Sequence, residues 1–274
     1  MNMRLLVSSV CVSLALLLCG CISVPDETYI VRRAHDAIGA EITEEKILRS
    51  DEFSLLSWNL YKGRKKGWVD DLLWLSENAD FVLIQEARLN DHLRQIMDTR
   101  GFDWNHVTAF KLNNVESGVM TASKIAPGSA QAIGVEEPLT GIPKTALISL
   151  FPISSTGTML MLINIHAVNL SLGTSSFQKQ WRRVYDTATG HAGPMIIAGD
   201  FNTWSDDRMA IVESFMENLG LEPVLFEPDR RTLFVGRTVD HVYFRGLSAS
   251  KALAVPVRSS DHNPLLITLR LAEN

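Results

Sequence analysis

Short apolar runs of strand length recur along most of this chain, and they limit the possible folds more than any other feature. From Phe53 onward these runs are rich in Val, Ile, Leu and aromatic residues, and helix-like segments separate some of them. The run from Met159 to Ile165 is apolar on both faces, which indicates a sheet buried between other layers. We count about ten to twelve expected strands but only about four expected helices. This proportion of strands is too high for a singly crossed parallel sheet. We therefore predict an α/β fold in which two sheets pack face to face with helices outside.

The first 21 residues have the layout of a secretory signal. One basic residue, Arg4, precedes an apolar stretch from Leu5 to Cys19, which is shorter than the roughly 20 residues that cross a bilayer. The letters "LCGC" end at Cys21 and resemble a bacterial lipobox, in which the cysteine sulfur takes a diacylglycerol. The alternative is an ordinary signal peptide whose cleavage site contains cysteines. We expect a protein of the cell envelope, anchored through Cys21 to a bacterial membrane and facing the periplasm or exterior.

The predicted domain organisation follows from this N-terminus. Residues 1–21 are the expected lipoprotein signal peptide, residues 22–50 are a charged segment without clear periodicity and are expected to be a tether, and residues 51–274 form one catalytic domain. All three cysteines lie in the signal segment, so the exported domain can form no internal disulfide. A net charge of −5 does not by itself indicate a nucleic-acid-binding protein.

Polar side chains stand at the ends of six of the apolar runs. In "IIAGDFNTW", Asp200 and Asn202 point to one face of an extended segment while Phe201 points to the other. An Asx turn would explain one such pair, but six polar strand ends in one domain suggest a shared cleft. Acids and amides without a thiolate suit a hard cation such as Mg²⁺, and histidines add proton transfer. The set is typical of metal-assisted phosphate ester hydrolysis and comprises Asn59, Glu86, His166, Asn169, Asp200, Asn202, Asp240, Asp261 and His262.

The order of these motifs resembles the endonuclease/exonuclease/phosphatase superfamily. The matching letters are "WN", "QE", "NIH", "GDFN", an Asp before an aromatic strand, and "SDHNP". The resemblance extends over nearly the whole predicted domain. It implies a four-layer α/β/β/α sandwich of two mixed sheets and a metal-dependent hydrolase that uses Mg²⁺, with Mn²⁺ as a possible substitute.

The resemblance also implies a role for each residue. Glu86 matches the principal metal carboxylate, assisted by Asn59 and Asp261. Asp200 matches the acid that orients or deprotonates the attacking water, and Asn202 its neighbour that holds water or phosphate. The remaining matches are His262 for the scissile phosphate, Asp240 for the carboxylate that orients that histidine, His166 for the transition state and Asn169 for a phosphate contact.

Three functional hypotheses remain. We favour an exported, lipid-anchored phosphodiesterase or phosphatase, with a nucleic-acid substrate preferred because the basic run Lys62–Lys66 follows Asn59 and should lie on the cleft rim. A phospholipid or sugar-phosphate esterase is the alternative, favoured by the acidic chain and the membrane tether. A catalytically silent binding module is the third, and the intact polar set argues against it. The oligomeric state stays open.

Overall fold

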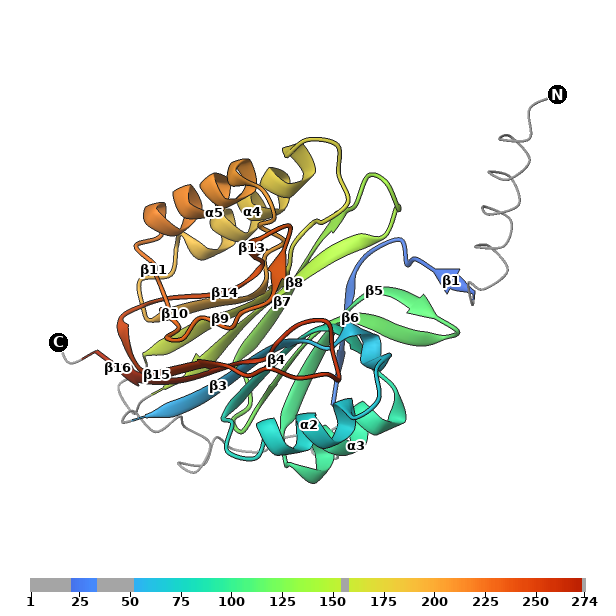
Figure 1. The fold of residues 1–274 in the computed structure, drawn as a ribbon, viewed down its shortest axis with the longest axis horizontal. Coiled ribbons are helices and arrows are strands. Elements are labelled where there is room, and N and C mark those ends of the chain that lie inside the picture. Colours follow the sequence, from blue (N-terminus) through green and yellow to red (C-terminus); the bar gives the residue numbers. More distant parts are fainter. Residues whose placement is uncertain (1–20, 34–51, 154–157, 273–274) are drawn as a thin grey trace.

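Two mixed β-sheets pack face to face, and helices cover their outer faces (Figure 1). The computed structural model describes residues 21–33, 52–153 and 158–272. The first sheet has the strand order β1-β5-β6-β4-β3-β16-β15, with β2 also paired to β5, and the second has the order β11-β14-β10-β9-β8-β7. The predicted α/β/β/α sandwich is confirmed.

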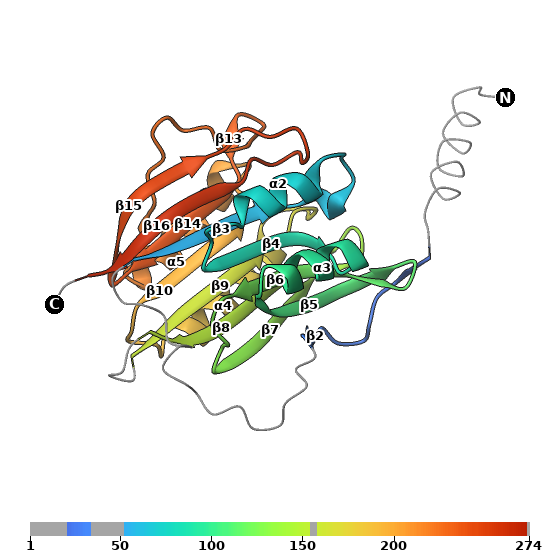
Figure 2. The same ribbon diagram turned by 90° about the horizontal axis from the view of Figure 1, so that it is seen from below.

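The elements of the first half of the chain build most of the first sheet. They are β1 (Ile22–Ser23), β2 (Tyr29–Arg32), β3 (Phe53–Asn59), the 3₁₀ turn η2 (Tyr61–Gly63), α2 (Trp68–Leu75), β4 (Phe81–Arg88), α3 (Asp91–Thr99), β5 (Asp103–Leu112) and β6 (Val115–Ser123). Helices α2 and α3 lie together on the outer face of this sheet (Figure 2).

The second half builds the other sheet and then returns to the first. Its elements are β7 (Ser129–Glu136), β8 (Pro143–Pro152), β9 (Met159–His166), α4 (Ser175–Ala188), β10 (Met195–Asp200), α5 (Asp206–Asn218), β11 (Glu222–Pro223), β12 (Leu233–Phe234), β13 (Arg237–Thr238), β14 (Asp240–Arg245), β15 (Leu247–Ala254) and β16 (Leu265–Leu271). Helices α4 and α5 cover the outer face of the second sheet (Figure 1).

Three apolar cores separate the four layers, because neighbouring strand residues point to opposite faces. On β3, Leu55 belongs to the core between the two sheets, whereas Leu56 belongs to the core beneath α2 and α3. On β10, Ile196 faces the inter-sheet core and Ile197 faces α4 and α5. Strands that are apolar on both faces are therefore buried on both faces, as the sequence pattern predicts.

Residues 22–23 and 29–32 are strands of the first sheet, in a segment that the sequence predicts to be a tether. Strand β1 pairs with β5 through Ile22 and Leu112, and β2 pairs with β5 from Tyr29 to Arg32. A free edge of β5 offers unpaired backbone groups, and the short run "YIVR" has the β-branched and aromatic residues that suit such pairing. Residues 1–20 of the expected signal peptide and residues 34–50 of the expected tether lie outside the described residues. Within the described residues, no helix has the length and apolar character needed to cross a membrane.

Candidate active site

The topology brings the polar strand ends to one edge of the sandwich. Strands β3 and β4 run parallel and end near Asn59 and Glu86, while β9 and β10 run parallel and end at His166 and Asp200. Strand β14 starts at Asp240, and Asp200 pairs in register with both Asp240 and His166. The carboxyl ends of parallel strands meet at one edge of a sheet, so residues far apart in sequence share one site.

A carboxylate, an imidazole and a second carboxylate form the centre of the site. The Nδ1 atom of His262 lies 2.8 and 3.0 Å from the two carboxylate oxygens of Asp240. The Nε2 atom of the same ring lies 3.9 Å from Oδ2 of Asp200. Burial alone would lower the pKa of His262, but the negative charges of Asp240 and Asp200 raise it to about 10. The imidazole is therefore charged at neutral pH and is held between two buried acids.

Asp200 is almost completely buried and is held by two amides. Asn59 Nδ2 donates to its Oδ2 at 2.9 Å, and the backbone N–H of Asn202 donates to its Oδ1 at 3.0 Å. Burial raises the pKa of Asp200 to about 6, although the charge of His262 opposes this. Asn202 has a φ of 51°, a left-handed conformation that Asn tolerates, and its side chain donates to the carbonyl of Ala167 at 2.9 Å.

The glycine of "GDFN" is required by the close approach of β9. A Cβ atom on Gly199 would lie 2.0 Å from the carbonyl oxygen of Ile165, and its φ of 141° is also unfavourable for other residues. This tight contact brings the end of β10 against the end of β9. It therefore sets the distance between Asp200 and His166, whose Nε2 lies 3.5 Å from Asp200 Oδ2.

Glu86 belongs to the first sheet and lies across the cleft from Asp200, which belongs to the second sheet. It stands at a distortion of β4. The pairing of β4 with β6 shifts between Ile84 and Ala87, and Glu86 has a left-handed φ of 51°. Its Oε2 atom is 2.5 Å from the Nζ atom of Lys62. Burial acts to raise the pKa of Glu86, but the charges of Lys62 and Lys144 outweigh burial and lower it. Glu86 is therefore ionised and already faces a cation.

Two lysines of the site are absent from the set predicted by sequence. Lys144 on β8 places its Nζ 2.9 Å from Nε2 of His166. Burial lowers the pKa of Lys144 in spite of nearby Glu86, and burial together with Lys144 holds the pKa of His166 well below its usual value. His166 is therefore neutral, and its Nε2 accepts a hydrogen bond from the Lys144 amino group. A lysine in the alternating strand "PKTALISLFP" carries no local signal of this role.

The sequence predicts that the basic run Lys62–Lys66 lies on the cleft rim, but two of its four cations bond to other residues of the site. Lys62 points into the cleft, and Lys65 Nζ donates to the carbonyl of Ser260 at 2.7 Å. Only Arg64 and Lys66 of the four cations are exposed. A pocket of about 180 Å³ lies at one side of the site, and its lining includes Lys62, Glu86, Glu137, Lys144 and His166 but not Asp200, Asp240 or His262.

Two predicted residues lie at the margin of this centre. The Asp261 side chain is exposed, and its Oδ1 accepts a hydrogen bond from Ser260 Oγ at 3.4 Å. The Ser260 hydroxyl has a shorter alternative acceptor in the carbonyl of Asn59 at 2.7 Å, and this bond ties the loop to the end of β3. The side-chain oxygen of Asn169 accepts from Trp204 Nε1 at 3.0 Å, so it is bound to a neighbouring loop.

The donor chemistry of the site fits a hard divalent cation. Asn59 and Glu86 supply an amide and an ionised carboxylate, and one carboxylate oxygen from each of Asp200 and Asp240 lies within 4.8 Å of the other, whereas the charged His262 beside them offers no lone pair to a metal. Oxygen donors of this kind suit Mg²⁺, which also retains water and binds substrate phosphate. Lys62 at Glu86 shows that this carboxylate stabilises a positive charge.

The comparisons with known proteins agree with this geometry. The profile of the Endonuclease/Exonuclease/phosphatase family matches residues 56–262. The chain belongs to this family. Endonucleases, exonucleases and phosphatases hydrolyse phosphate esters, so membership in the Endonuclease/Exonuclease/phosphatase family places the protein among the phosphoester hydrolases.

Individual proteins resemble this chain in sequence or in fold. The UPF0294 protein of Vibrio vulnificus strain YJ016 is 39% identical over 230 residues, which cover 84% of this chain and 81% of that protein. An endonuclease/exonuclease/phosphatase from Beutenbergia cavernae shares the fold with a TM-score of 0.65 at 16% identity, covering 81% of this chain and 72% of that chain. ANGEL2, a 2′,3′-cyclic phosphatase in complex with adenosine-2′,3′-vanadate, has a TM-score of 0.60 at 16% identity and covers 81% of this chain and 96% of that chain.

Proposed function

We propose that the protein is an exported, lipid-anchored phosphodiesterase that requires a divalent metal ion such as Mg²⁺. The observation that carries the proposal is the buried arrangement in which His262 bonds to Asp240 and faces Asp200. A charged imidazole beside a buried acid supplies an electrostatic partner for an anionic transition state and an acceptor for a proton.

The side chains divide the chemistry between them. His262, whose pKa is about 10, remains protonated and stabilises the negative charge that develops on the phosphoryl oxygens. Asp200, whose pKa is about 6, is ionised at slightly alkaline pH and orients or deprotonates the attacking water. Lys144 and His166 lie on the same sheet as Asp200 and supply a lysine amino group and a neutral imidazole for the phosphate.

A metal ion adds to this arrangement when it is bound. Asn59, Glu86 and Asp261 would hold it, and it would supply positive charge for the phosphate and its leaving oxygen. Asp240 holds His262 in its charged form and in one orientation, as a carboxylate behind a catalytic histidine does.

Turnover of soluble model esters tests the proposal. With Mg²⁺ we expect hydrolysis of bis-p-nitrophenyl phosphate, loss of activity in excess chelator and recovery after Mg²⁺ is restored. His262→Ala should abolish turnover, whereas His92→Ala, at an exposed position on α3, should leave it unchanged. Equal activity of the two variants, or full activity in chelator, would overturn the assignment.

A nucleic-acid substrate is the second candidate. The exposed cations Arg64 and Lys66 near the cleft favour it, because a basic rim attracts a phosphate backbone. If nucleic acid is the substrate, replacing both cations by Gln should weaken cleavage of plasmid DNA and flatten its salt dependence. Unchanged salt dependence would exclude this role for the two residues.

A further inference from the structure

Exposed apolar side chains collect on three loops around the cleft. Large apolar groups at a protein surface, when they gather beside a site, mark an interaction surface. The hairpin of β12 and β13 exposes three consecutive apolar residues, and the loops after β7 and β9 expose three leucines. We call these six side chains the apolar rim: Leu139, Leu170, Leu172, Leu233, Phe234 and Val235.

The three loops belong to the same edge of the sandwich as the catalytic groups. The hairpin leads into Asp240 at the start of β14, and Thr232 beside it accepts a hydrogen bond from the N–H of Asn263 at 2.7 Å. The other two loops are tied to each other, because Glu137 Oε1 accepts from the N–H groups of Asn169 and Leu170 at 2.8 and 2.7 Å. The rim is therefore attached to both walls of the cleft.

One rim residue stands where the backbone disfavours it. Val235 has a left-handed φ of 52°, and Gly236 after it has a φ of 78°. Two positive φ values at a two-residue hairpin turn suit Asn-Gly, whereas a β-branched residue is strained there. Yet Val235 is 76% exposed and gains little from packing. Local stability does not explain an apolar side chain at this position, so we assign it to a contact outside the chain.

The N-terminal attachment point lies at the same edge. The N–H of Asn113, in the turn between β5 and β6, donates to the carbonyl of Cys21 at 3.0 Å. Ala87, next to Glu86, pairs with Gly118 on β6. From Gly118 the β5–β6 hairpin extends three more residues to Val115, so its turn lies about 10 Å beyond the level of Glu86. Figure 1 shows β1 at this end of the sheets. A lipid on Cys21 would therefore hold the cleft edge toward the bilayer.

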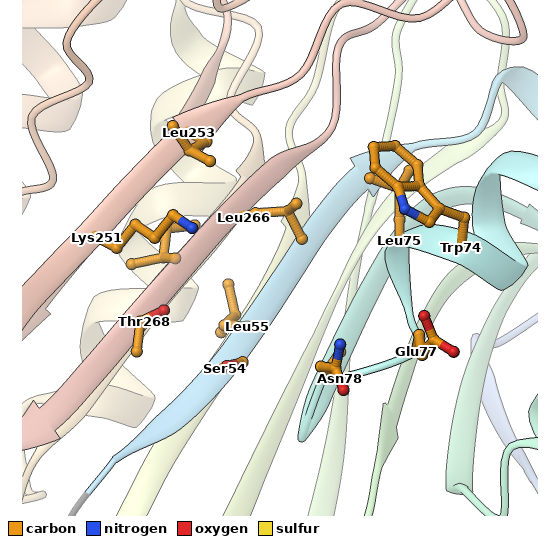
Figure 3. A pocket seen from close by; sticks show the side chains of 12 residues that line it. Ser54, Leu55, Trp74, Leu75, Glu77, Asn78, Lys251, Leu253, Leu266 and Thr268 are labelled. Atoms are coloured by element: carbon orange, nitrogen blue, oxygen red, sulfur yellow. The ribbon is translucent and has the colours of Figure 1, made fainter.

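Another exposed apolar site lies at the other end of the molecule. Figure 3 shows a pocket of about 260 Å³ between the end of α2 and strands β3, β15 and β16, with the indole of Trp74 at its edge. Its lining includes Ser54. Ser54 lies five residues before Asn59 on β3, which is a distance of about 16 Å along the strand. Apolar exposure by itself does not identify the docking face, and this second site serves as an internal control.

We propose that the apolar rim docks the cleft edge on a phospholipid bilayer, and that the phosphodiester hydrolysed is that of a phospholipid in this bilayer. The proposal rests on the proposed phosphodiesterase function and specifies its substrate class. Apolar side chains around the cleft enter the boundary between headgroups and acyl chains. Exposed Arg64 and Lys66 face anionic headgroups, and the cleft receives the phosphate.

The test uses the full chain reconstituted into vesicles of phosphatidylethanolamine and phosphatidylglycerol. Val235→Asn relieves the strained turn and removes one apolar contact. We expect it to lower hydrolysis of the vesicle phospholipid at least tenfold, while its hydrolysis of bis-p-nitrophenyl phosphate stays unchanged and its melting temperature is equal or higher. The matched control is Trp74→Ser, which removes a 59% exposed indole from the distant pocket and should change none of these values.

A second measurement reports docking without activity. Phe234→Trp adds an indole to the rim, and brominated acyl chains should quench the added fluorescence. Leu253→Trp adds an indole to the distant pocket and should not be quenched. If the protein hydrolyses neither the vesicle lipid nor the soluble diester, the phosphodiesterase proposal fails while quenching still decides docking. Equal vesicle rates for Val235→Asn and wild type, absence of quenching at Phe234→Trp, or cleavage of DNA but not of phospholipid would overturn the inference.

Discussion

Replacing Asp240 by Asn tests how the central pair works, because it removes one charge and keeps the shape of the side chain. Both carboxylate oxygens of Asp240 lie within 3.0 Å of His262 Nδ1. Burial opposes the charged imidazole, and Asp240 contributes the largest effect in its favour, so that the pKa of His262 rises from 6.5 to about 10. The variant should bring this pKa back toward 6.5.

The magnitude follows from linkage between protonation and folding. A pKa of about 10 in the folded protein against 6.5 in the unfolded chain corresponds to about 5 kcal/mol favouring the charged form. Because the pKa is raised, this stability is fully present below pH 6.5 and is lost as the pH rises to about 10. We expect Asp240→Asn to destabilise the protein by about 2–4 kcal/mol at pH 7, with the difference from wild type vanishing above pH 10.

Urea unfolding between pH 5 and 11 measures this difference, and the imidazole signal of His262 in NMR gives its pKa directly. Turnover should fall by several orders of magnitude, since losing the carboxylate behind a catalytic histidine costs about 10⁴ in serine proteases. The double variant with His262→Ala should be hardly slower than His262→Ala alone, because the two residues act as one unit. Additive losses, or an unchanged pKa of His262, would refute this account and indicate that Asp240 acts elsewhere, for example on the metal.

Three further predictions concern other parts of the protein. Glu86→Ala removes the chief charged ligand, so activity should collapse and calorimetric Mg²⁺ titration should show weaker binding, and wild-type affinity in the variant would contradict the assignment. Asp200→Asn should abolish turnover yet raise the free energy of unfolding at pH 8 by on the order of 1–3 kcal/mol, because burial raises the pKa of Asp200 from 3.8 to about 6 and its ionised form costs stability. Cell fractionation should show that Cys21→Ser is soluble or retained as a precursor, and unchanged detergent partitioning would exclude the lipid anchor.

The local sequence pattern was enough to predict the architecture and most of the site. Alternation along β3 and β10 places Leu55 and Ile196 in one core and Leu56 and Ile197 in two others, and such alternation is visible in any single strand. Polar side chains at strand ends are equally local, and they are the residues that the structure brings to one edge, with Asp261 more exposed than the rest.

Only the tertiary structure decided the electrostatics of the cleft and the place of the N-terminal segment. Lys144 reaches His166 because β8 and β9 pair in one register, and Lys62 reaches Glu86 because η2 folds back over β4. Residues 22–23 and 29–32 become strands because β5 presents a free edge to them, which the charged composition of the segment does not reveal. Side-chain periodicity is a property of neighbours in the chain, so sequence predicts it. Charge pairing and edge pairing depend on which distant strands meet, and that is known only once the sheets are assembled.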